Sequence, residues 1–168
     1  MAPADDLAVL RAEAQAGRGE ALHLLGLAHF LGQGTPRDPV EARRLQREAA
    51  RRGVVDAQFE LSLLLALGLG GAVDARGARR WEEKAAEAGH PRACLNRGAR
   101  LARARRPQLA EAVRWYARAA DGGNAEAAAR LCRMSLLGQG LPRDERTARR
   151  WYQRAIELGY DWSATTRA

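Results

Sequence analysis

The chain has 168 residues, of which 46% are hydrophobic and 29% are charged, as in one soluble domain with an extended rather than globular core. No apolar run approaches the roughly 18 residues that a membrane span requires. The opening MAPADD places two acids ahead of the first apolar residues, unlike a signal peptide. We therefore expect a cytoplasmic protein without a membrane span, and its formal net charge of +8 favours acidic partners.

Helices are expected along the whole chain, because large and small residues recur at three- and four-residue steps. Their expected ranges are 5–16, 19–31, 39–52, 55–67, 75–88, 91–104, 108–121, 125–137 and 145–158. Glycines end alternate helices, where a residue of positive φ is favoured, at Gly17, Gly53, Gly89, Gly123 and Gly159. Their spacing of 36, 36, 34 and 36 residues indicates an internal repeat.

A glycine-rich loop occurs twice almost unchanged, as LGQGTPRD at residues 31–38 and as LGQGLPRD at residues 137–144. Glycines that open onto a helix are typical of phosphate loops, but such a loop is normally single, whereas a connector recurs in every repeat. A related loop, LGLGGAVD, fills residues 67–74, and the loop of the third repeat is two residues shorter and lacks the glycines. We therefore expect a structural joint in which Asp38 or Asp144 caps the following helix.

Two sets of equivalent repeat positions, which we call columns, indicate how the helices pack. Bulky residues stand eight positions before each closing glycine, at Val9, Leu45, Trp81, Trp115 and Trp151. Alanines recur at Ala21, Ala57, Ala93 and Ala127, and again at Ala42, Ala78, Ala112 and Ala148. Because alanine lets helix backbones approach while an aromatic ring fills the gap, we expect the three tryptophans to be buried between the two helices of their repeats.

The order of the motifs resembles a known family. A-x-x-x-L-G is followed by G-x-G-x-P-x-D, by A-x-x-W-Y-x-x-A-A and by the closing glycine, and this order resembles the Sel-one-like repeat, a relative of the tetratricopeptide repeat. The resemblance implies an all-α fold, a right-handed α/α superhelical solenoid of helix-turn-helix repeats. Members of this family mostly act as adaptors and scaffolds for other proteins. The third repeat departs most, because Arg97 stands where leucine is expected.

The expected organisation is a capping half repeat, four full repeats and a tail. The half repeat spans residues 1–17, the repeats span 18–53, 54–89, 90–123 and 124–159, and the tail spans 160–168. Four stacked repeats exceed the minimum of roughly three that a solenoid needs to bury its apolar faces. The tail begins a fifth repeat and stops.

The charge is unevenly distributed along the chain. Residues 1–84 hold 12 basic and 12 acidic residues, whereas residues 85–168 hold 16 and 8. A GC-rich genome also explains an excess of arginine, and paired arginines such as Arg43 and Arg44 are expected on a solvated outer face. Arg92, Arg100 and Arg103, by contrast, share one stripe of a helix.

The resemblance implies that the first helix of each repeat lines a concave binding side. The expected partner-binding residues are Phe30, Phe59, Leu63, Arg92, Arg100, Arg103 and Arg133. An apolar floor with flanking arginines suits an acidic amphipathic helix or an extended peptide. The apolar members also fit an alternative role as core between repeats.

No catalytic, cofactor or metal site is expected. The histidines, His23, His29 and His90, have no neighbouring carboxylate and nucleophile in a recognisable pattern. The Ser-x-x-Lys motif of penicillin-directed enzymes is absent. Cys94 and Cys132 have neither metal nor redox spacing, so packed free thiols are expected.

Three functions from different classes remain open from the sequence. A protein-binding adaptor or scaffold is favoured. Nucleic-acid binding through the basic half is the alternative, weakened by the lack of exposed aromatics interleaved with the arginines. A hydrolase is disfavoured by the motif search. An immunity protein that neutralises a secreted bacterial toxin is a narrower form of the adaptor, since some bacterial proteins of similar repeats act in this way. The sequence identifies neither the partner nor the oligomeric state.

Overall fold

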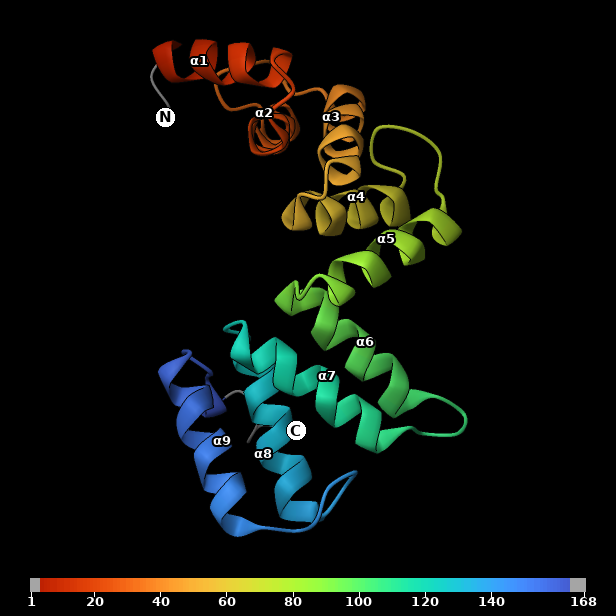
Figure 1. The fold of residues 1–168 in the computed structure, drawn as a ribbon, viewed down its shortest axis with the longest axis vertical. Helices are drawn as coiled ribbons and strands as arrows, with labels where there is room; N and C mark the ends of the chain where they lie inside the picture. Colours follow the sequence, from red (N-terminus) through yellow and green to blue (C-terminus); the bar gives the residue numbers. More distant parts are fainter. Residues whose placement is uncertain (1–3, 164–168) are drawn as a thin grey trace. The chain divides into compact units, whose positions relative to one another are not determined.

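The computed structural model describes residues 4–163, with side chains from Leu7 onward. This part of the chain contains nine α-helices and no strand (Figure 1). They are α1 (Ala4–Gln15), α2 (Gly19–Leu31), α3 (Pro39–Arg51), α4 (Val55–Leu67), α5 (Ala75–Glu87), α6 (Pro91–Arg103), α7 (Leu109–Asp121), α8 (Ala125–Leu137) and α9 (Glu145–Glu157). Each expected helix is found to within one residue at either end, and the all-α fold class is confirmed. The end of the predicted tail, residues 164–168, lies outside the described residues.

The chain forms two compact units, Met1–Ala88 and Gly89–Ala168. The first unit holds α1 to α5 and the second holds α6 to α9. Within each unit, neighbouring helices in the sequence pack against one another: α2 against α3, α3 against α4 and α4 against α5 in the first, and α6 to α9 in the same manner in the second. Each unit is therefore built from stacked helix pairs.

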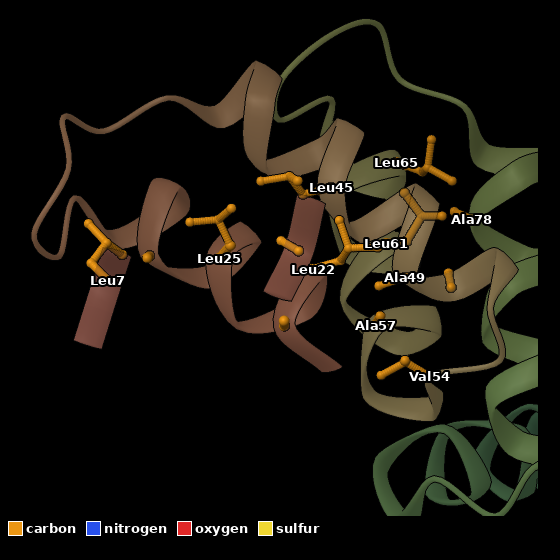
Figure 2. Packing of buried hydrophobic residues seen from close by; sticks show 14 residues of the cluster. Leu7, Leu22, Leu25, Leu45, Ala49, Val54, Ala57, Leu61, Leu65 and Ala78 are labelled. Carbon is orange, nitrogen blue, oxygen red and sulfur yellow. The ribbon is translucent and has the colours of Figure 1, made fainter. Parts of the chain in front are cut away.

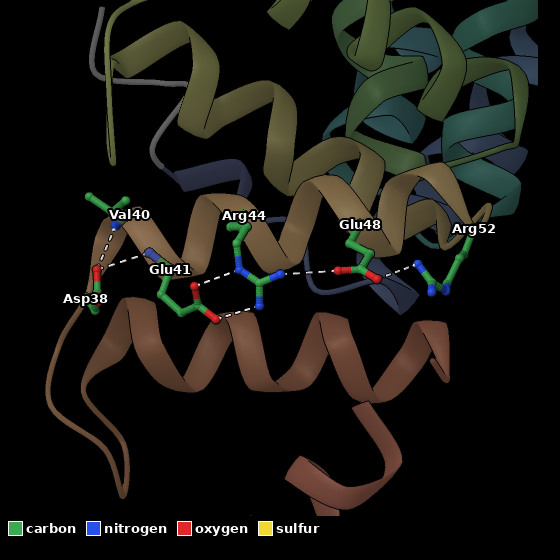
Figure 3. A network of polar contacts seen from close by, with 6 residues as sticks. All are labelled: Asp38, Val40, Glu41, Arg44, Glu48 and Arg52. Atoms are coloured by element: carbon green, nitrogen blue, oxygen red, sulfur yellow. Dashed lines mark hydrogen bonds and ion pairs between the residues drawn. The ribbon is translucent and has the colours of Figure 1, made fainter. Parts of the chain in front are cut away.

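The helix ends form as their residues predict. The closing glycines Gly17, Gly53, Gly89, Gly123 and Gly159 all have φ between 81° and 94°, the left-handed conformation that glycine adopts without steric cost. Asp38 accepts hydrogen bonds of 3.0 Å from the backbone N–H groups of Val40 and Glu41 at the start of α3 (Figure 3). Asp144 caps α9 in the same way. Both predicted N-caps are confirmed.

The second glycine of each glycine-rich loop lies against the preceding repeat. A Cβ atom on Gly70 would overlap the carbonyl group of Pro39 at the start of α3, and one on Gly140 would overlap that of Leu109 at the start of α7. Both glycines also have positive φ, 72° and 77°. The loop is thus a joint that locks one repeat onto the previous one. The short loop after α6 lacks both glycines.

The core of the first unit is a continuous cluster of leucine and alanine (Figure 2). Its largest members are Leu7, Leu22, Leu25, Leu45, Leu61 and Leu65, contributed by four successive helices. Burying one such leucine contributes roughly 1.5–3 kcal/mol relative to leaving it exposed. The alanines of the repeat columns, such as Ala42 and Ala57, are 0% exposed, so neighbouring helices approach closely along them.

Glycines inside two first helices make room for a side chain of the next helix. A Cβ atom on Gly26 would lie 2.9 Å from Nε2 of Gln46, and one on Gly98 would lie 2.7 Å from the ring of Tyr116. Tyr116 is only 2% exposed. The buried aromatic ring of α7 is therefore Tyr116 rather than its neighbour Trp115.

The tryptophans are less buried than predicted. Trp81, Trp115 and Trp151 are each half-buried. A basic side chain one helical turn later covers part of two of the rings, with Nζ of Lys84 at 4.6 Å from the Trp81 centroid and Cζ of Arg118 at 5.1 Å from that of Trp115. A cation over the face of a half-buried indole ring is favourable at a partly wet surface.

The predicted solvated face of the paired arginines needs one correction. Arg43 is 8% exposed, and its guanidinium donates a 2.9 Å hydrogen bond to the carbonyl of Ala72. The loop that carries Gly70 lies over it. Arg44 is exposed as expected and pairs with Glu41 and Glu48 along α3 (Figure 3). Sequence position alone could not separate the two arginines, because only the next loop decides which is covered.

Candidate partner-binding surfaces

The predicted site residues fall into two groups, one in each unit. Phe30, Phe59 and Leu63 belong to α2 and α4 of the first unit, and we call them the apolar surface. Arg92, Arg100, Arg103 and Arg133 belong to α6 and α8 of the second unit, and we call them the basic surface.

The apolar surface is only partly accessible. Leu63 is 37% exposed, and Leu67, one turn later on α4, is 67% exposed. Phe30 is half-buried and is covered by Arg37, whose Cζ lies 5.7 Å from the ring centroid. Arg37 also donates a 3.1 Å hydrogen bond to the Phe30 carbonyl, which holds the side chain in place. A partner on this surface would therefore meet leucine side chains and a capped aromatic ring.

Phe59 differs from its neighbours, because it is 4% exposed. It lies one turn before Leu63 on α4, on the side that packs inward. The alternative role as core therefore applies to Phe59 and not to Leu63. Its substitution would test packing rather than contact with a partner.

The basic surface is built chiefly on α6, which carries four arginines and no acid among its 13 residues. Arg92 and Arg103 are exposed and Arg100 is half-buried. Among the side chains described, from Leu7 to Ser163, neither Arg92 nor Arg103 makes an ion pair or a side-chain hydrogen bond. These two guanidinium groups remain available for an anionic partner.

Arg97, which stands where the repeat has leucine, lies against an aromatic ring. Its Cζ atom is 4.1 Å from the centroid of Trp115. A guanidinium stacked on an indole keeps much of its stabilisation without full hydration. Trp115 in turn donates a 3.4 Å hydrogen bond from Nε1 to Glu111. The arginine at a leucine position is thus accommodated by the half-buried tryptophan.

Arg133 is exposed on α8, one turn after Arg130. Arg133 and Ala102, the residue before Arg103, line one cavity of about 260 Å³ between α6, α7 and α8. The structure therefore brings Arg133 close to the end of the α6 stripe. Arg130 has a different role, because it donates bonds of 2.6 and 3.1 Å to Glu126. Burial opposes the charge of Arg130, but its hydrogen bond with Glu126 and the nearby charges raise its pKa.

Two histidines and the two cysteines have structural roles. His90 caps α6 by accepting a 3.3 Å hydrogen bond from the N–H of Ala93, and His23 is buried in a 2.9 Å hydrogen bond with Gln46. Burial raises the pKa values of the Cys94 and Cys132 thiols, which favours the uncharged, unreactive form. The described part of the chain holds no cluster of three metal-ligating side chains, and no helix in it is long and apolar enough to cross a bilayer.

Comparison with known proteins gives the family. The model of the Sel1 repeat matches residues 19–54, 55–90, 92–124 and 125–160. The chain belongs to the Sel1 repeat family. The resemblance inferred from the motifs is thereby confirmed.

Solved structures support the assignment. A Sel1 repeat protein from Oxalobacter formigenes is 29% identical with a TM-score of 0.89, and the match covers 95% of this chain and 46% of that one. The immunity protein Pa5087 from Pseudomonas aeruginosa is 19% identical with a TM-score of 0.60, and the match covers 92% of this chain and 58% of that one. At that identity the second likeness concerns the fold alone.

A curated relative is the exopolysaccharide production negative regulator of Rhizobium meliloti (strain 1021). It is 38% identical over 73 residues, which cover 40% of this chain and 27% of the relative. This Sel1 repeat chain thus spans roughly a quarter to somewhat over half of the length of these proteins. Sel1 repeat proteins generally mediate protein–protein interaction, and their fold is typically that of a non-catalytic adaptor.

Proposed function

We propose that this Sel1 repeat chain is a cytoplasmic, non-enzymatic adaptor or scaffold that binds an acidic, amphipathic segment of a partner protein. The observation that carries the proposal is the composition of α6, whose exposed Arg92 and Arg103 have no acidic partner among the described residues. The free, buried thiols of Cys94 and Cys132 accord with a reducing compartment.

The arginines suit a protein carboxylate. The planar guanidinium binds a carboxylate through two parallel hydrogen bonds and tolerates partial desolvation better than an ammonium group. The exposed Leu63 and Leu67 of the first unit offer apolar contacts. An acidic amphipathic helix or an extended peptide binds through charged and apolar side chains together.

Nucleic-acid binding is the alternative, favoured by the 16 basic residues of positions 85–168. Single-stranded nucleic acid is held largely by bases stacked on aromatic rings. Trp115, the ring nearest the arginine cluster, already carries Arg97 and Arg118 within 4.1 and 5.1 Å of its centroid. This arrangement leaves little aromatic surface for stacking, so we favour the protein partner.

Charge reversal with a matched control tests the proposal. Partners are captured from a nuclease-treated extract of the source organism and identified, and their affinity is then measured by calorimetry. Arg92→Glu with Arg103→Glu is expected to weaken binding at least tenfold, a change of about 1.4 kcal/mol. Arg76→Glu with Arg80→Glu alters two exposed arginines of α5 and produces the same net charge, and it is expected to leave the affinity within about twofold.

Equal weakening by both double variants would show that only net charge matters and would contradict a defined binding surface. Tight binding of a random DNA duplex at physiological salt, lost in the α6 variant, would instead support the nucleic-acid alternative.

A further inference from the structure

The cavity of about 260 Å³ between α6, α7 and α8 has an apolar side, formed by residues such as Leu109 and Met134, and a polar side that carries Arg130, Arg133 and Gln139. We infer that it is a recognition pocket that takes one apolar side chain of a partner, while Arg133 binds a carboxylate adjacent to that side chain. The inference rests on the proposed adaptor function and names the part of the basic surface that sets sequence preference.

The origin of the cavity follows from comparing equivalent repeat positions. Ala102 stands nine residues after Ala93, and Phe30 stands nine residues after the equivalent Ala21. In the first unit this position therefore holds a phenyl ring, over which Arg37 lies. In the second unit it holds the methyl group of Ala102, which lines the cavity beside α8.

One side of the cavity favours an apolar occupant. Met134 and Tyr116 line it and are 6% and 2% exposed. Leu109 contributes from the first turn of α7. The other side is polar, because Cζ of Arg130 lies 5.7 Å from the Tyr116 ring centroid and Gln139 also lines the cavity. The volume is below the roughly 300–1,000 Å³ of small-molecule sites. The cavity is therefore large enough for one side chain but smaller than a typical metabolite site.

The charge at the edge specifies the rest of the occupant. Arg130 is already bound to Glu126 by two hydrogen bonds. Arg133 is exposed and has no ion pair within the described residues. Its equivalent in the second repeat, six residues after the column alanine, is Leu63. An arginine has thus replaced a leucine beside an open apolar pocket. A carboxylate within reach of an apolar side chain complements this pair of features.

Titration with small fragments, followed by NMR, tests directly whether the pocket binds such a side chain. The chain has two methionines, Met1 and Met134, so labelling the methionine methyl groups with ¹³C gives one signal from the cavity wall. N-acetyl-leucine carries an isobutyl group next to a carboxylate, and N-acetyl-leucinamide is its neutral counterpart. We expect a saturable shift of the Met134 signal with the acid in the low-millimolar range, and at least about fivefold weaker binding of the amide.

Substitutions that copy the first unit supply the variants. Ala102→Phe restores the ring of Phe30 and is expected to abolish the shift. Arg133→Leu copies Leu63 and is expected to equalise the acid and the amide. Arg149→Leu removes an exposed arginine of α9 and is expected to change neither. The Met134 signal and the helical circular dichroism verify that each variant is folded.

Absence of a saturable shift up to about 20 mM, or an unchanged shift in folded Ala102→Phe, would overturn the pocket. If captured partners then still depended on Arg92 and Arg103, the adaptor proposal would stand without it. If the fragment bound as expected but reversal of Arg92 and Arg103 left partner affinity unchanged, the pocket would stand and the proposed function would fail.

Discussion

Helices α2 to α4 and helices α6 to α8 occupy the same repeat register but present different side chains. Alanines such as Ala57 and Ala127, where helices approach one another, are 0% exposed in both sets. Between those columns, Phe30 of the first set corresponds to Ala102 of the second, and Leu63 corresponds to Arg133. The comparison teaches that the columns determine the fold, whereas the positions between them are free to differ and so to determine recognition.

The same contrast extends to the interior. Gln46 and Tyr116 occupy equivalent positions, and each fits against a glycine of the preceding helix. Gln46 takes part in a polar pair with His23, whereas Tyr116 supplies an aromatic ring at 2% exposure. One backbone arrangement thus accommodates a buried amide in the first unit and a buried aromatic ring in the second.

The largest expected loss of stability comes from truncating the buried ring of Tyr116. Tyr116→Ala should lower the free energy of unfolding by about 3–5 kcal/mol, as for other fully buried aromatic rings. Trp115→Ala should cost about 1–2 kcal/mol, since its ring is half-buried and stabilised chiefly by cation–π contacts. Urea denaturation followed by circular dichroism measures both. A greater loss for Trp115→Ala would mean that the order of burial on α7 is wrong.

The glycine joint gives the next effect. Gly140→Ala should destabilise by about 3 kcal/mol, because the new Cβ overlaps the backbone of Leu109 and the φ of 77° is unfavourable for alanine. Gly123→Ala is the matched control, with a φ of 92° but nothing within 4 Å of the added Cβ, and should cost about 1 kcal/mol. Equal losses, measured by urea denaturation, would show that the loop does not lock the repeats together.

Thiol labelling distinguishes the two units, because Cys94 and Cys132 both lie in the second. Their buried state and raised pKa values should make alkylation at neutral pH on the order of a hundredfold slower than in urea. Labelling across a urea gradient then reports opening of α6 to α9 alone. Fast labelling of the native protein would contradict the packing of these helices.

The smallest effect is electrostatic. The hydrogen bond from Arg44 lowers the pKa of Glu41, so the stabilisation is complete above the unfolded-state value of about 4.3 and is lost as the pH falls through the lower folded value. The pair is largely exposed, so we expect at most about 0.5 kcal/mol. Arg44→Met should remove this part of the acid-range dependence of stability, and Arg114→Met, its equivalent in the third repeat, should not. If both variants changed the pH dependence of stability equally, the pair of Arg44 and Glu41 would not be its source.

Much of the fold follows from local residues. The closing glycines end alternate helices and aspartates cap the starts of α3, α5 and α9, and both kinds of signal act within a few residues of the chain. Together with the repeat spacing, they allowed the nine described helices to be predicted to within one residue.

The candidate site was less accessible to prediction, because exposure depends on neighbouring repeats. Arg43 and Arg44 are adjacent in the sequence, yet only the former is covered by the loop at Ala72. Phe59 and Leu63 lie on adjacent turns, yet only the latter is exposed. The cavity beside Ala102 was missed because an alanine in a repeat suggests packing. Aligning the repeats places Ala102 at the position of Phe30, and this change from a large to a small side chain could have indicated the cavity.

Salt dependence with one apolar substitution tests the central claim that the partner is a protein segment held by apolar as well as charged contacts. For an identified partner segment, we expect the slope of log affinity against log salt to be shallow, about one to two, and Leu63→Ser to weaken binding about tenfold at every salt concentration without changing the slope. Contact with many duplex phosphates would instead give a slope of roughly 0.9 for each phosphate neutralised. A steep slope, together with an affinity that Leu63→Ser does not change, would contradict the account.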